Sequence, residues 1–172
     1  MVSSVASSAL GEIAFTFQNV TQHFGAGEAP VFRDLNLSIA AGQFVSILGP
    51  SGCGKSTLLR LIAGLQTPTS GTVQHHAAAD NQRISFVFQH PTLLPWRTAE
   101  QNLRLPLELW PSDARRSLTL NDQERRHQLL EQVGLSAQDV TKRPAEMSGG
   151  MQMRLSLARA LVTDPTVLLL DE

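Results

Sequence analysis

The most informative stretch of this chain is Gly49-Pro50-Ser51-Gly52-Cys53-Gly54-Lys55-Ser56-Thr57, which fits the pattern G-x-x-x-x-G-K-S/T. Glycines let a backbone turn tightly enough for successive N–H groups to converge on the oxygens of a phosphate group. A helix that starts near Lys55 would add the positive end of its dipole to the same anion site. The Lys55 ammonium can reach the β- and γ-phosphates of a nucleotide, and the Ser56 hydroxyl can bind the magnesium ion that accompanies them.

The sequence on either side of this loop has the character that a phosphate-binding loop requires. Before it, Phe44–Leu48 is a short continuous apolar run, which is typical of a strand buried on both faces. After it, apolar residues recur at helical spacing from Leu58 to Leu65. Cys53, inside the loop, is either a thiol activated by the helix N-terminus or a small residue of which only the backbone N–H matters.

Further from the loop, the apolar pattern predicts an α/β chain. Strands are expected at Ile13–Phe24, Val31–Ile39, Thr72–Gln74, Ile84–Phe88 and Thr166–Leu170. Helical composition covers Thr98–Leu135, and a last helix is expected over about Gly150–Val162. These segments predict a helical insert near residues 95–160.

Length and composition narrow the class of protein. The chain has 172 residues, 42% of them hydrophobic and 17% charged, which is enough apolar side chain for a folded core. The formal net charge of −1 gives no electrostatic footprint for nucleic acid, and a single cysteine excludes a disulfide framework and a cysteine-based zinc site. No apolar run approaches the roughly 20 residues of a membrane-spanning helix, and Met1–Gly11 lacks the basic start of a secretory signal, so we expect a cytoplasmic protein.

An apolar strand near the end of the sequence delivers two carboxylates. Val167-Leu168-Leu169-Leu170 is followed directly by Asp171 and Glu172. Ligands of open parallel sheets bind outside the carboxyl ends of the strands. We therefore expect Asp171 to hold magnesium, directly or through water, and Glu172 to polarise the water that attacks the γ-phosphate.

A third motif comes before the last predicted helix. Met147-Ser148-Gly149-Gly150-Met151 precedes the helical segment Gln152–Val162. Together with the phosphate loop and the Asp-Glu pair, in this order and spacing, this motif makes the chain resemble the ATP-binding subunit of ABC transporters. The resemblance implies an α/β fold, a P-loop NTPase core of the ABC type with an N-terminal antiparallel β subdomain and an inserted α-helical subdomain. It also implies ATP and Mg²⁺ as cofactors.

The resemblance assigns roles to further residues. Ser148, Gly149 and Gly150 match the family's signature motif, whose helix N-terminus closes over the γ-phosphate held by a partner subunit, so that two subunits enclose two ATP molecules. Gln89 matches the glutamine that joins the core to the helical subdomain and senses magnesium and the attacking water. Phe24 is either the aromatic residue that stacks on adenine or a core residue at the end of a strand.

The resemblance also implies partners. Pro91–Trp96, and Met151 where the family more often has Gln, are most similar to the branch that imports nitrate, sulfonates, taurine and related solutes. This branch implies transmembrane permease subunits, a second ATP-binding subunit that we expect to be a copy of this chain, and a solute-binding protein that acts indirectly. It places the protein at the inner face of the cell membrane. We expect a flexible lead-in over residues 1–12 and an ATP-binding domain over residues 13–172.

The sequence stops at Glu172, before the family's aspartate-containing loop and its histidine, so we expect a domain that is incomplete at its C-terminus. Two hypotheses follow: an ATPase subunit that powers a separate permease, and a nucleotide-binding module without turnover. A third class, the ABC-type ATPases of DNA repair or translation, is disfavoured because the chain has neither coiled-coil heptads nor an internal repeat.

Overall fold

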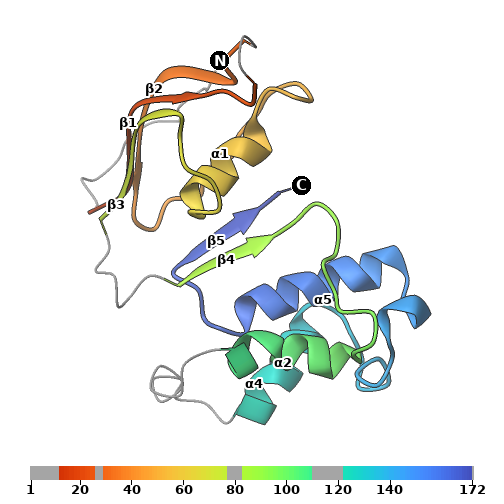
Figure 1. The fold of residues 1–172 in the computed structure, drawn as a ribbon. Helices are drawn as coiled ribbons and strands as arrows, with labels where there is room; N and C mark the ends of the chain where they lie inside the picture. Colours follow the sequence, from red (N-terminus) through yellow and green to blue (C-terminus); the bar gives the residue numbers. More distant parts are fainter. Residues whose placement is uncertain (1–11, 26–28, 77–82, 110–121, 172) are drawn as a thin grey trace. The chain divides into compact units, whose positions relative to one another are not determined.

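The structure is a computed structural model that describes residues 12–25, 29–76, 83–109 and 122–171 (Figure 1). The chain divides into two compact units, Met1–Asn81 and Gln82–Glu172, which are called unit 1 and unit 2 below and are each described separately. Apart from Glu12, the predicted lead-in lies outside the described residues.

Unit 1 contains a three-stranded antiparallel sheet with the strand order β2-β1-β3. The strands are β1 (Ile13–Gln22), β2 (Phe32–Ala40) and β3 (Ser70–His75). Phe17 of the middle strand is paired with Leu37 on one side and with Val73 on the other. The strands predicted at these three places are confirmed.

The middle strand explains an irregular spacing in the sequence. Phe15 and Phe17 are two residues apart, whereas Val20 comes three residues after Phe17. The pairing of β1 with β2 shifts register between Phe17 and Val20, and Asn19 between them has a φ of +48°. This β-bulge, whose backbone conformation Asn tolerates, returns Val20 to the buried face, where all three apolar side chains are at most 4% exposed.

Helix α1 (Lys55–Ile62) directly follows the phosphate loop, as the sequence predicts. Its apolar side chains fall on one face and are buried, as are Phe15, Phe17 and Val20 of β1. An isolated helix of this length is marginal in water, so such a short helix is stabilised mainly by the burial of its apolar surface. This burial contributes about 25 cal/mol of free energy per Å². Burial of this face therefore stabilises the helix that directly follows the phosphate loop.

The strand predicted over Phe44–Leu48 is wrong. The structure shows no strand at these described residues, and the side chains of Phe44 and Leu48 are 94% and 77% exposed. An apolar run forms a strand only where a neighbouring strand satisfies its backbone hydrogen bonds. The described strands of unit 1 pair with one another, and none of them pairs with this segment.

Unit 2 combines a parallel strand pair with helices. β4 (Ile84–Val87) is parallel to β5 (Val167–Leu170), which confirms the two strands predicted here. The helices are α2 (Ala99–Leu109), α4 (Asp122–Gln132), the short 3-10 helix η2 (Pro144–Glu146) and α5 (Gly149–Leu161). The predicted last helix is confirmed as α5.

A continuous apolar cluster joins the helices of unit 2. α2, α4 and α5 all contribute buried side chains, and Leu135, Met147 and Val162 complete the cluster. α5 contacts both α2 and β4, so this helix connects the cluster to the parallel strands. No helix in the described part of the chain is long and apolar enough to cross a membrane.

Candidate functional site

The phosphate loop takes its shape from glycines. Gly52 and Gly54 have φ angles of +78° and +99°, a region that residues with a side chain rarely adopt. A Cβ on Gly54 would also lie 2.3 Å from Val31 Cγ1 and 2.9 Å from Phe32 Cζ, whereas a Cβ on Gly52 would meet nothing within 4 Å. The loop therefore lies against the start of β2 at Gly54 and faces open space at Gly52.

Helix α1 directs its positive end at this loop. Its N-cap is Gly54, which offers no side chain to the first N–H groups, and its first turn contains no acidic residue. The Lys55 ammonium donates hydrogen bonds to the carbonyl oxygens of Gly49 and Pro50, both at 3.1 Å. The lysine charge is thus held within the loop, next to the N-terminus of the helix. These are the features by which the N-terminus of a helix binds an anion.

The remaining residues of the loop differ in exposure. Ser56 is half-buried, whereas Thr57 is buried. Cys53 is exposed, and its thiol folds back over Gly49, where a Cβ would lie 2.5 Å from Cys53 Sγ. The Cys53 N–H donates to the Pro50 carbonyl at 3.3 Å, which closes the turn at the tip of the loop.

Phe24 is an exposed residue and not part of the core. Its side chain is 61% exposed and follows the end of β1 by two residues. The Val31 N–H donates to the Gln22 carbonyl at 2.8 Å, and the Val31 side chain borders Gly54. The connection that carries Phe24 therefore begins beside the phosphate loop, within the same unit.

The parallel strands of unit 2 end together and place two predicted residues at one edge. Val87, the last residue of β4, is paired with Leu170, the last of β5, and the Asp171 N–H donates to the Val87 carbonyl at 3.0 Å. Gln89 and Asp171 therefore both follow the carboxyl ends of the strands (Figure 1). Gln89 is exposed and Asp171 is buried. Glu172 lies outside the described residues.

The signature residues lie at the exposed start of α5. Ser148 is the N-cap of this helix, and its Oγ accepts a hydrogen bond from the Met151 N–H at 3.2 Å. Gly149 and Gly150 are exposed, and a Cβ on either would meet nothing within 4 Å. The first turn of α5 is thus accessible to a ligand or to another chain.

Two polar residues that the sequence analysis missed hold the segment between β4 and α2. Asn102 of α2 is fully buried and hydrogen-bonds the backbone of this segment, and Arg159 of α5 hydrogen-bonds Thr92. Burial lowers the pKa of the Arg159 guanidinium, which nevertheless stays protonated at neutral pH. Two features of the sequence could have pointed to these residues: the Asn102 amide lies on the apolar face of α2, and the Arg159 charge interrupts the apolar run 157–161.

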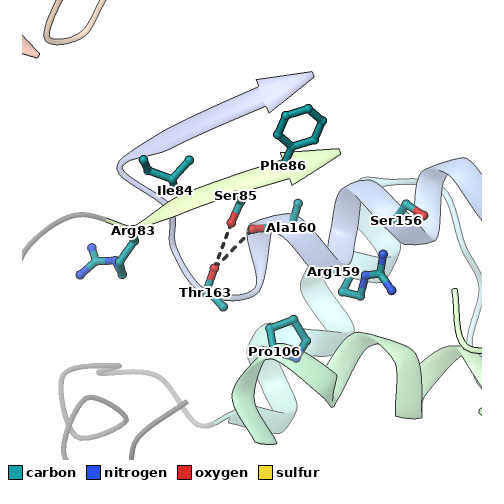
Figure 2. A pocket seen from close by; sticks show the side chains of 9 residues that line it. All are labelled: Arg83, Ile84, Ser85, Phe86, Pro106, Ser156, Arg159, Ala160 and Thr163. Carbon is teal, nitrogen blue, oxygen red and sulfur yellow. Dashed lines mark hydrogen bonds between the residues drawn. The ribbon is translucent and has the colours of Figure 1, made fainter. Parts of the chain in front are cut away.

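A cavity of about 300 Å³ lies in unit 2, where β4, α2 and α5 meet (Figure 2). The hydroxyl oxygens of Ser85 and Thr163, 3.3 Å apart, line it together with Pro106 and Arg159. The buried Ser156 hydroxyl, also in the lining, has no hydrogen-bond partner among the described residues. None of the predicted site residues lines this cavity. The candidate functional residues are the phosphate loop in unit 1 and, separately, the strand edge and the signature turn in unit 2.

Comparison with known proteins agrees with these motifs. The sequence profile of the ABC transporter family matches residues 32–172. The chain belongs to the ABC transporter family. Among the relatives in this family, the aliphatic sulfonates import ATP-binding protein SsuB 1 of Agrobacterium fabrum is 42% identical over 168 residues, covering 97% of this chain and 56% of that protein. The methionine import ATP-binding protein MetN of Caulobacter vibrioides is also 42% identical, covering 91% of this chain and 49% of that protein.

This chain spans about half the length of these curated ABC transporter relatives. Solved structures of the family have the same fold. An ATP-binding cassette that was solved as a dimer in a post-hydrolysis state, bound to ADP and Pi, matches with a TM-score of 0.75 and 34% identity, over 92% of this chain and 73% of that one. A dimeric bacterial ABC transporter cassette matches with a TM-score of 0.74. The predicted α/β fold of the ABC type is confirmed.

Proposed function

We propose that this chain is the ATP-binding and ATP-hydrolysing part of an importer subunit that powers a separate membrane permease. The observation that supports the proposal is the phosphate loop, where glycines of positive φ, the N-terminus of α1 and the Lys55 ammonium lie together. A loop of this kind, placed before the start of a helix, typically binds the phosphates of a nucleotide. Relatives named as ATP-binding proteins of importers support the same function.

The residues present suit a magnesium ion that binds together with the nucleotide. Mg²⁺ is usually held by one or two carboxylates plus substrate phosphates and water, so a dedicated cluster of protein ligands is not required. Within the described ranges, no group of three or more His, Cys, Asp or Glu side chains is placed to hold a metal ion. The proposed ligands are Ser56 and Asp171, with Gln89 at the same strand edge as Asp171. Bound there, the ion would neutralise charge that develops on the phosphate oxygens.

The other proposed site residues bind the nucleotide, orient the attacking water and accept its proton. Lys55 holds the β- and γ-phosphates, and Phe24 stacks on the adenine through its exposed ring. Glu172 accepts the proton of the attacking water, which Gln89 orients. The helix start at Ser148 binds the γ-phosphate held by a second copy of the chain, as its open first turn allows.

Partners and solute follow from the same proposal. The proposed ATP-binding domain covers residues 13–172. Its inserted helical subdomain, at about residues 95–160, contains α2, α4 and α5. This subdomain docks on permease subunits at the inner face of the membrane. A solute-binding protein acts indirectly. The relatives are named for aliphatic sulfonates, methionine and sulfate or thiosulfate, and an aliphatic sulfonate or a similar small solute is the proposed cargo.

ATP turnover of the full-length protein tests the enzymatic part. Lys55→Ala removes the loop ammonium, so both ATP binding and turnover should be lost. Glu172→Gln keeps the side-chain volume but not the base, so ATP should bind with unchanged affinity while kcat falls by about 10²-fold or more. Arg60→Gln, on the exposed face of α1, is the control that should change neither quantity.

Two outcomes would contradict this function. If the wild-type protein turns over no more ATP than Lys55→Ala, while it still binds ATP, the chain is a binding module without turnover. For the solute, a gene deletion should abolish growth on an aliphatic sulfonate as sole sulphur source, and the wild-type gene, but not Lys55→Ala, should restore it. Unimpaired growth of the deletion strain would exclude this cargo.

A further inference from the structure

The segment that leaves β4 and enters α2 is held by two polar side chains from two different helices, the buried Asn102 and the half-buried Arg159. On its far half, Asn102 Oδ1 accepts the Leu94 N–H at 2.7 Å. The Asn102 amide nitrogen lies within 3.1–3.2 Å of the backbone carbonyl oxygens of Leu94, Arg97 and Thr98. Asn102 is completely buried, so these bonds fix the segment to α2.

The near half of the segment is held from α5. Arg159 donates one guanidinium N–H to the Thr92 carbonyl at 2.8 Å and another to Thr92 Oγ1 at 2.7 Å. Both distances are at the short end of the range for such bonds, and the planar fork of an arginine fixes direction as well as distance. The Arg159 side chain lines the cavity where α5, α2 and β4 meet (Figure 2).

The position of Thr92 gives this contact a functional meaning. Thr92 is three residues after Gln89, and Arg159 lies on the helix that starts at the signature serine, Ser148. The stretch of α5 between Ser148 and Arg159 is a continuous helix about 16 Å long, at 1.5 Å per residue, and acts as a stiff rod. A movement of the signature turn would therefore be passed through Arg159 to the residues that follow Gln89.

We propose that Arg159 is a positioning residue for ATP hydrolysis, whose fork on Thr92 makes Gln89 follow the movement of the signature helix. The inference rests on the function proposed above and adds a residue that touches neither nucleotide nor magnesium. Gln89 then takes its working position when Ser148 engages the nucleotide of the second copy. Hydrolysis is thereby tied to closure of the dimer.

The test compares variants of the full-length protein. Thr92→Val removes the hydroxyl acceptor but keeps the side-chain shape, and Thr92→Ser restores the hydroxyl. Arg159→Lys keeps the charge but loses the fork, and Arg154→Lys is the same substitution at an exposed position of the same helix. We expect kcat to fall about tenfold in Thr92→Val and Arg159→Lys, with the dissociation constant for ATP unchanged, because a charge-assisted hydrogen bond is lost away from the nucleotide.

Hydrogen exchange of the amides from Gln89 to Leu93 should rise in the same two variants, while Thr92→Ser and Arg154→Lys match the wild type in every readout. A contact that only stabilises the fold would instead lower the melting temperature and leave kcat per folded molecule unchanged, and that result would overturn the inference alone. Absence of wild-type turnover above Lys55→Ala would overturn the proposed function and this inference with it.

Discussion

Backbone strain and close contacts both oppose a side chain at Gly54, whereas only backbone strain opposes one at Gly52. Both residues have positive φ, but a side chain on Gly54 would also overlap Val31 and Phe32. Gly52→Ala should therefore lower the free energy of unfolding by about 1 kcal/mol, from backbone strain alone. Gly54→Ala should cost about 3 kcal/mol or more, because strain and overpacking add. Urea denaturation of both variants measures the difference, and equal costs would mean that Gly54 does not press on β2.

The same residues show what a sequence can and cannot reveal about a site. The turn around Gly52 and Gly54 and the helix start at Lys55 could be predicted because their chemistry lies in nine consecutive residues. Arg159 could not, since it reaches Thr92 across 67 residues and one of its acceptors is a backbone carbonyl, which every residue has. Motifs of adjacent residues are visible in a sequence, whereas a single side chain that holds distant backbone becomes visible only in the fold.

Among the strands, the difference between β1 and residues 44–48 has the same origin. The period of β1, including its bulge at Asn19, reflects a strand with one buried face and two described neighbours. The run Phe44–Leu48 has no such period, and continuous hydrophobicity says nothing about which strand would pair with it. β4 and β5 are just as short and apolar, but they pair with each other in parallel. Apolar content therefore predicts a strand reliably only where a partner strand is supplied.

The start of α2 depends on a turn that should respond to pH. The carbonyl oxygens of Val140 and Lys142 accept the N–H groups of Glu100 and Ala99 at the start of the helix. Asp139 braces the turn by accepting hydrogen bonds from the Lys142 ammonium at 2.7 Å and from the hydroxyl and N–H of Ser136 at 2.7 and 2.9 Å. These donors, Lys142 first, lower the pKa of Asp139 from 3.8 to about 2.

Asp139→Asn should consequently destabilise the protein at neutral pH and lose this effect in acid. Because the pKa of Asp139 is lower in the folded than in the unfolded state, the ionised carboxylate contributes its full stabilisation above about pH 4. The contribution disappears as the pH falls from 3.8 toward 2. Denaturation of wild type and variant across this range should show their free energies of unfolding converging. A difference that stays constant down to pH 2 would mean that the carboxylate charge does not brace the turn.

In the whole molecule, each of the two units contributes some of the residues of the proposed site. The phosphate loop belongs to unit 1, whereas Gln89, Asp171 and the signature turn belong to unit 2. Two of the solved cassettes that resemble this chain are dimers, and one of these two holds ADP and Pi. The exposed first turn of α5 is thus the surface where a second copy of the chain would complete the site in our proposal.

Ser148 allows this assembly to be tested without disturbing the helix that it caps. Asp and Asn are as good as Ser at an N-cap, so Ser148→Asp and Ser148→Asn should leave the melting temperature nearly unchanged. Asp would place a negative charge against the γ-phosphate of the second copy, and like charges in contact cost several kcal/mol. Light scattering of full-length protein carrying Glu172→Gln, with ATP and Mg²⁺, should show dimers for Ser148→Asn and monomers for Ser148→Asp. Equal dimer formation by both variants would show that Ser148 does not face a phosphate across the interface.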